Sequence, residues 1–188
     1  TDRESMLFDE IIGAVAADLE TQVRVELAKK VAVSNVAVHR TARRLAMDVI
    51  EVARPVIENS KSLSEADLLE VIKVKSQDHM LAVTKRPDIG ENVSSALVAK
   101  GEDRVVVSLL ENRTAKMDRE TYQRVAERAE ANPVLHAPFV RNAQVPLDLL
   151  NNVYLKVEHN LRREIMRKFH GVSPAELEAA LEASRNHL

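Results

Sequence analysis

The 188-residue sequence predicts an all-α protein built from stacked pairs of short helices, an α-solenoid with a unit of about 27 residues. Three observations predict this fold class. Residues that favour helix, chiefly Ala, Leu, Glu, Lys and Arg, are abundant, whereas the chain has only 4 Gly and 6 Pro. An apolar residue recurs at a regular spacing, and in most units a helix-starting residue follows it. Short helical stretches with polar ends, such as those ending at Asn59, Asn112 and Asn142, precede the recurring positions.

Five apolar positions mark the repeating unit, and they are Val36, Leu63, Ile89, Met117 and Val145. Successive marks are 27, 26, 28 and 28 residues apart. The last four are each followed by a residue that favours a helix start, namely Ser64, Gly90, Asp118 and Pro146. One short helix pair cannot bury both of its apolar faces, so neighbouring pairs must stack. We therefore expect the last four marks to be buried at turns between helices.

Other predicted helix starts and stops agree with the positions of these five marks. The segment Asp48–Glu51 resembles a capping box, and Asn132 followed by Pro133 predicts another helix start. Gly101 predicts a left-handed stop to the helix that begins near Glu91.

Two β-branched runs, Val71–Val74 and Arg104–Val107, have the composition of strands. We interpret both as buried helix, because helix caps flank them and no partner strand is evident. Pro55 and Pro138 occupy one position in two units and should each kink or shorten a helix.

The C-terminal part of the chain has a different pattern. Apolar residues at i+3 and i+4 spacing predict one long helix over residues 146–170, which Gly171 ends. Ser173, Pro174 and Glu176 combine a cap, a first-turn proline and a capping carboxylate, and predict a final helix that covers the end of the array. We expect a repeat array over residues 1–145 and a C-terminal helix pair over residues 146–188, packed as one domain.

Four segments of the chain resemble an uncharacterised alphaproteobacterial family with HEAT-like helical repeats, domain of unknown function 2336. They are EVARPVIENS at 51–60, LSEADLL at 63–69, KRPDI at 85–89 and ALVAKG at 96–101. The resemblance covers roughly residues 20–160. It implies a HEAT-like fold and a bacterial cytoplasmic protein, and it supplies no catalytic residues. The first residue is Thr1 rather than Met, as expected for a fragment of a longer protein.

Composition argues against several classes of function. The chain has no Cys, which excludes disulfides and Cys-based zinc sites. Its net charge is -2 and its pI about 6.3, which is not the basic footprint of a typical nucleic-acid-binding domain. No apolar run approaches the roughly 18 residues of a membrane helix, and no signal peptide opens the chain. We expect a cytoplasmic protein that does not enter a membrane.

No catalytic, metal-binding or phosphate-binding motif is present. The six His residues include no HExxH motif and no pair at i, i+4, and no glycine-rich run is available for a phosphate loop. Acidic pairs occur at Asp9–Glu10, at Asp67 with Glu70 and at Glu127 with Glu130. We interpret these pairs as solvated helix faces rather than as acid–base groups. The sequence therefore predicts a protein that is not an enzyme and binds no cofactor or metal.

A basic cluster is the one candidate interaction site, and it consists of Arg40, Arg43 and Arg44. The three arginines share one face of a predicted helix, opposite the apolar Ala42 and Leu45. We expect a non-enzymatic protein-interaction scaffold, in a bacterial regulatory pathway, that binds a protein partner through this face. The alternative is a HEAT-like repeat protein that binds nucleic acid, which the absence of Trp and the scarcity of other aromatic residues disfavour.

Overall fold

The computed structural model describes residues 2–16, 20–36, 38–168 and 175, and its secondary structure within these residues is entirely helical. The all-α prediction is therefore confirmed. The elements in chain order are α1 Asp2–Ala16, α2 Thr21–Ala32, α3 His39–Ala46, α4 Ile50–Asn59, α5 Glu65–Val74, α6 Gln77–Thr84, α7 Glu91–Lys100, α8 Asp103–Glu111, α9 Arg119–Ala131, the 3-10 helix η1 Pro133–Leu135, α10 His136–Arg141 and α11 Leu147–Lys168.

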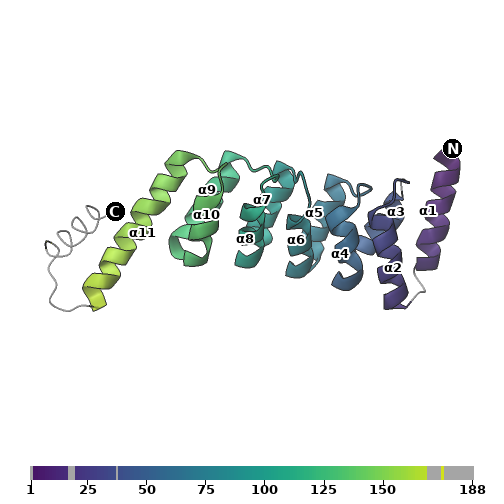
Figure 1. Cartoon of the computed structure of the whole chain (residues 1–188), viewed down its shortest axis with the longest axis horizontal. Helices are drawn as coiled ribbons and strands as arrows, with labels where there is room; N and C mark the ends of the chain where they lie inside the picture. The colour runs from purple at the N-terminus through teal and green to yellow at the C-terminus, as the bar shows by residue number, and fades with distance from the viewer. Residues whose placement is uncertain (1, 17–19, 37, 169–174, 176–188) are drawn as a thin grey trace.

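The helices form an elongated stack of pairs, with α1 at one end and α11 at the other (Figure 1). Consecutive helices pack together in the pairs α3–α4, α5–α6, α7–α8 and α9–α10. Helices two apart in the chain also contact one another, so α2, α4, α6, α8 and α10 form one continuous row. Each pair is thus held by its neighbours as well as by its own two helices.

One apolar core runs along the whole stack, from Ala28 to Val153. The last four apolar marks of the repeating unit all belong to it and are between 3% and 9% exposed, so their predicted burial is confirmed. The first mark, Val36, is 46% exposed and does not join the core. The unit before α3 therefore departs from the pattern of the later ones.

The two β-branched runs are helical, as expected. Val71 and Ile72 are buried in α5, and Val105 and Val106 are buried in α8. Burial of these side chains on both sides of a short helix outweighs their weak preference for strands.

Side-chain caps begin several helices where the sequence predicts them. The Ser64 hydroxyl accepts a hydrogen bond from the backbone N–H of Asp67, whose carboxylate in turn accepts the backbone N–H of Ser64. The carboxylate of Asp118 accepts the N–H of Thr121 at 2.7 Å and begins α9. Asn132 caps the short helix that Pro133 opens.

The capping box predicted at Asp48–Glu51 is wrong. Helix α4 begins at Ile50, and its first residues have no side-chain cap. The carboxylate of Asp48 instead accepts the N–H of Val49 at 2.7 Å and forms an ion pair with Arg24 of α2, also at 2.7 Å. A charged partner on another helix therefore outweighs the local capping arrangement.

The left-handed stop predicted at Gly101 is also wrong, although α7 does end immediately before this glycine. The φ angle of Gly101 is -73°, which any residue can adopt. Glycine is needed here because a side chain would clash with neighbouring atoms. A Cβ atom at this position would lie 2.5 Å from the carbonyl oxygen of Leu97 and 2.7 Å from a methyl carbon of Val105.

The C-terminal part begins with α11, which packs against α9. Within α11, Val153 is buried and Leu150 is half-buried, which agrees with the apolar spacing of the predicted long helix. The predicted final helix after Ser173 lies outside the described residues, apart from residue 175.

Pro55 and Pro138 lie inside α4 and α10, and α10 is only 6 residues long.

Polar contacts between neighbouring pairs recur at the predicted repeat distance. The carboxamide of Asn92 donates to the carboxylate of Glu65, and the ammonium of Lys100 donates to the carbonyl of Lys73. In both contacts the two residues are 27 apart. These two contacts therefore join neighbouring pairs at the spacing of the predicted unit.

Replacing Leu63 by alanine should lower the free energy of unfolding by about 2–4 kcal/mol, because the side chain fills a packed site between helix pairs. Urea denaturation followed by circular dichroism measures the change. The matched control is Val36→Ala at the exposed first mark, which should change stability by less than about 0.5 kcal/mol. Equal effects of the two substitutions would show that the buried position of the unit is wrongly assigned.

Gly101→Ala should destabilise the protein by about 1–3 kcal/mol, because the new methyl group overlaps the backbone of α7 and the side chain of Val105. Gly90→Ala is the control, since its methyl group would meet only the carboxylate of Glu65 at 3.5 Å. We expect this control to stay within about 1 kcal/mol of the wild type. Thermal unfolding of the two variants tests the difference.

Candidate functional site

The three arginines predicted as an interaction site lie together on the outer surface of α3. Thr41, Ala42, Leu45 and Ala46 face the core, which leaves Arg40, Arg43 and Arg44 exposed on the opposite side of the helix. They line a hollow of about 310 Å³, which we call the arginine hollow; its other lining residues are His39, Met47 and Glu70. Helical periodicity alone therefore placed these side chains on one surface correctly.

Carboxylates of α5 partly neutralise the arginine hollow. The guanidinium of Arg43 donates to Glu70 at 2.6 Å and lies 3.4 Å from a carboxylate oxygen of Asp67. The hydrogen bond and the charge of Glu70 raise the pKa of Arg43 above its ordinary value. His39 pairs with the other carboxylate oxygen of Asp67 at 2.8 Å. The hollow thus combines both signs of charge, with the cations in excess.

The position of α3 depends on a buried carboxylate from α1. The carboxylate of Asp9 accepts the backbone N–H groups of Arg40 and Thr41 at 2.9 and 3.0 Å, and the hydroxyl of Thr41 at 2.6 Å. These N–H groups belong to the first turn of α3, where a negative charge is favoured by the helix dipole. Asp9 therefore caps α3 and ties the start of this helix to α1.

Asp67, like Asp9, is more buried than the sequence predicts. We expected the acidic pairs to be solvated, but Asp9 and Asp67 are each only 6% exposed. Burial opposes ionisation of Asp67, yet hydrogen bonds from the hydroxyl and backbone N–H of Ser64, together with His39, hold its pKa below the ordinary value. The prediction failed because the partners of Asp9 lie 31 and 32 residues away, and His39 lies 28 residues from Asp67.

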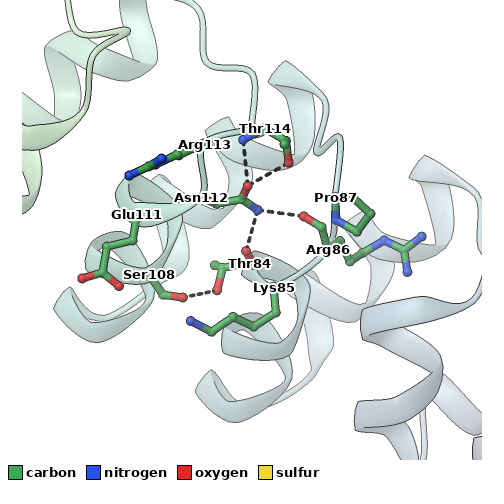
Figure 2. Close-up of a pocket in the computed structure, with 9 residues that line it drawn as sticks. All are labelled: Thr84, Lys85, Arg86, Pro87, Ser108, Glu111, Asn112, Arg113 and Thr114. Carbon is green, nitrogen blue, oxygen red and sulfur yellow. Dashed lines mark hydrogen bonds between the residues drawn. The ribbon is translucent and has the colours of Figure 1, made fainter.

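A second surface lies along the C-terminal ends of α6, α8 and α10. A hollow of about 380 Å³ separates the ends of α6 and α8 (Figure 2). Asn112 spans its floor, because its carboxamide nitrogen donates to the carbonyls of Thr84 and Arg86 at 2.8 and 2.7 Å. The carboxamide oxygen of Asn112 accepts the N–H and hydroxyl of Thr114. This side chain joins the ends of two successive helix pairs.

Figure 2 also shows how the charged side chains of this hollow are directed. Lys85, Glu111 and Arg113 extend to one side, whereas the guanidinium of Arg86 extends away from them. Arg86 donates to the carbonyls of Ile57 and Ser60 and so caps the end of α4. Burial lowers the pKa of Arg86. Arg86 is therefore a structural cap, and the other three charges are presented to the surface.

An adjoining hollow of about 470 Å³ continues this surface to the end of α10. Glu111 and Arg113 line both hollows, so the two lie side by side. At the far end lie Arg141 and Asn142, and the carboxamide of Asn142 donates to the carbonyl of Leu110 at 2.8 Å. We call the combined surface the edge groove. Its charged residues at the groove opening are Lys85, Glu111, Arg113 and Arg141.

Sequence reasoning missed the edge groove, although one signal was present. Lys85, Arg113 and Arg141 each lie within one residue of the C-cap of their helix, where a cation is favoured by the helix dipole. Isolated cations at helix ends are common, so only the stacking of α6, α8 and α10 reveals that these three lie along one groove.

No three His, Asp or Glu side chains among the described residues are placed to hold a metal ion. The hydroxyls of Ser94 and Tyr122 are buried without hydrogen-bond partners, and neither lines any of the three hollows. In the described part of the chain, no helix has both the length and the apolar character to cross a membrane.

Comparison with known proteins identifies the family. The chain belongs to the family described as uncharacterised protein conserved in bacteria (DUF2336), whose model matches residues 52–188. No curated protein and no solved structure matches the chain. The match includes the edge groove and begins after α3, so the arginine hollow lies largely outside it.

Replacing Asp67 by asparagine should reduce the acid sensitivity of the protein. The lowered pKa of Asp67 stabilises the fold above the ordinary carboxyl pKa of about 3.9, and this contribution is lost as pH falls through the lower value in the folded state. Asp67→Asn should be less stable at pH 7 by about 1–3 kcal/mol. It should then lose less stability than the wild type on acidification to about pH 2.

Urea unfolding at several pH values measures this dependence. The control is Glu127→Gln, which removes an exposed carboxylate of α9 and should leave the wild-type pH profile nearly unchanged. Parallel profiles for Asp67→Asn and the wild type would show that the Asp67 carboxylate does not contribute as described.

Proposed function

We propose that this member of the uncharacterised bacterial family is a non-enzymatic protein-interaction scaffold built from HEAT-like helical repeats, and that it acts in a regulatory pathway of the cytoplasm. Stacked helix pairs present one extended surface made from equivalent positions of successive units. Such a surface suits binding to another macromolecule better than it suits enclosing a small substrate. The two basic surfaces of this chain supply the charge that selects the partner.

The observation that carries the proposal is the arginine hollow. Asp9 caps the helix that carries the three arginines, and Glu70 holds the guanidinium of Arg43. Arginine is enriched among residues that dominate protein interfaces, since its planar guanidinium matches a carboxylate. Met47 adds an adaptable apolar contact at the same place. We expect this hollow to hold an acidic side chain of a partner protein beside an apolar one.

Nucleic acid is the alternative partner, and the charges of the hollow disfavour it. Glu70 lies among the arginines, and Asp67 is within 3.4 Å of the Arg43 guanidinium. A phosphate backbone placed on this surface would meet the negative charge of Glu70. The chain also has no Trp and only 3% aromatic residues, which leaves little to stack on bases.

Replacing Arg40, Arg43 and Arg44 together by alanine should abolish partner binding while leaving the fold intact, because all three side chains are exposed. Affinity capture from a bacterial lysate, read out by mass spectrometry, should recover a protein with the wild type that the variant fails to retain. The matched control is Arg54→Ala/Lys61→Ala/Lys116→Ala, which removes the same charge from exposed positions outside the hollows. This control should retain the partner.

The same two variants distinguish a protein partner from nucleic acid. By fluorescence anisotropy, a mixed-sequence DNA duplex should bind no tighter than about 100 μM at physiological salt. Three phosphate contacts would instead give a log–log salt slope of about -2.7. Micromolar binding that the arginine variant abolishes and the control retains would replace the scaffold proposal with a nucleic-acid-binding one.

A further inference from the structure

We propose that the edge groove, formed by the C-terminal ends of α6, α8 and α10, is a second docking site and that it binds an extended acidic segment of a partner protein. The inference rests on the proposed scaffold function and adds a site and a chemical class of ligand. Its evidence is the shape, the net positive charge and the rigidity of the groove.

The shape of the edge groove suits a chain segment. Its two hollows of about 380 and 470 Å³ share Glu111 and Arg113, so they adjoin one another along three successive helix pairs. Each hollow is large enough for several side chains, since ligand sites begin at about 300 Å³. A segment lying along the stack would contact both hollows, whereas a compact small molecule would fill only one.

The edge groove has a net positive charge, and its cations form no salt bridges. Lys85, Arg113 and Arg141 are exposed, and no carboxylate of the described residues forms a salt bridge with any of them. Some other exposed arginines of the stack are paired with an acid of a neighbouring helix pair, as Arg104 is with Asp78 at 2.8 Å. The helix dipole favours cations at these helix ends, but it does not supply a counter-charge of full strength. An acidic partner would supply it.

Asparagine caps make the groove able to accept an anion. Free carbonyls at a helix C-terminus repel negative charge. Here Asn112 donates to the carbonyls of Thr84 and Arg86, and Asn142 donates to the carbonyl of Leu110. These carbonyls are therefore already hydrogen-bonded, so the cations above them determine the local potential.

The groove is also held rigid before any ligand binds. The hydroxyls of Thr84 and Ser108 share a hydrogen bond of 2.6 Å across its floor, and the carboxamide of Gln144 donates to the carbonyl of Arg113 at 3.0 Å. Contacts between successive helix pairs thus fix the spacing of the backbone segments that carry the cations. A preorganised surface loses less entropy on binding and can select a segment by its charge spacing.

Glu111 favours a protein segment over a phosphate backbone. It lies where the two hollows join, so a polymer with a negative charge at every unit would meet a like charge at the centre of the groove. A protein segment can place a neutral or basic residue at that point and carboxylates on either side.

The test uses a fluorescein-labelled peptide of about 12 residues, with glutamates in both halves and neutral serines at the centre opposite Glu111, which spans roughly 40 Å when extended. Fluorescence anisotropy measures its binding to the full chain at low salt. The edge variant Lys85→Gln/Arg113→Gln/Arg141→Gln should weaken binding at least tenfold, whereas the matched control Arg54→Gln/Lys61→Gln/Lys116→Gln should change it by less than threefold. Glu111→Gln should tighten binding, because it removes the repulsive charge.

Circular dichroism melting confirms that each variant is folded. A Lys85→Arg/Arg113→Lys/Arg141→Lys variant should retain binding because its charge is preserved.

Equal weakening by the edge variant and the control would overturn the inference. The absence of binding to the wild type at about 1 mM peptide would also overturn it. Weakening only by Arg40→Gln/Arg43→Gln/Arg44→Gln would place the acidic segment in the arginine hollow. In that case the edge inference fails and the scaffold proposal stands. Tighter binding of duplex DNA at the edge groove would also overturn it.

Discussion

The helices from α3 to α10 are too short to be stable by themselves, and the rest of the structure follows from this constraint. Isolated helices of fewer than about 12–15 residues are marginal in water, and most of these have 10 residues or fewer. Each helix is stabilised by burying its apolar face against its own partner and against the next pair. The core is consequently a continuous strip along the stack, and every exposed side chain has a position set by the packing of its neighbours.

The same shortness makes helix ends a large share of the backbone, so their polar groups need partners. Many of these partners come from a neighbouring pair rather than from the same helix. Asp9 of α1 caps the beginning of α3, and Arg86 and Asn112 cap the ends of α4 and α6. These contacts fix successive pairs relative to one another. Arg86 and Asn112 also line the edge groove, and Asp9 holds the helix that carries the arginine hollow, which links stability to the two candidate binding surfaces.

The two surfaces differ in how their charge is arranged. In the arginine hollow, Arg43 is held between Asp67 and Glu70, so part of the positive charge is compensated within the chain. Along the edge groove, the cations have no such partners in the described residues. A hollow with fixed charges of both signs favours specific contacts with a matching surface, whereas a row of cations without salt bridges favours attraction of an acidic segment. Both arrangements are consistent with binding to protein, and together they allow two contacts with one partner or with two.

The sequence by itself determined the helical class, the burial of Leu63, Ile89, Met117 and Val145, and the caps at Ser64 and Asp118. It also placed the three arginines on one face of α3. All of these depend on periodicity or on hydrogen bonds within one helical turn. Only the tertiary structure decided the burial of Asp9 and Asp67, the pairing of Asp48 with Arg24, the steric need for Gly101 and the existence of the edge groove. The pairings of Asp9, Asp67 and Asp48 join residues 24 to 32 positions apart, and the edge groove likewise arises from helices of different pairs. No short-range pattern specifies which side chains will meet across such a distance, because packing of whole helices against one another brings them together.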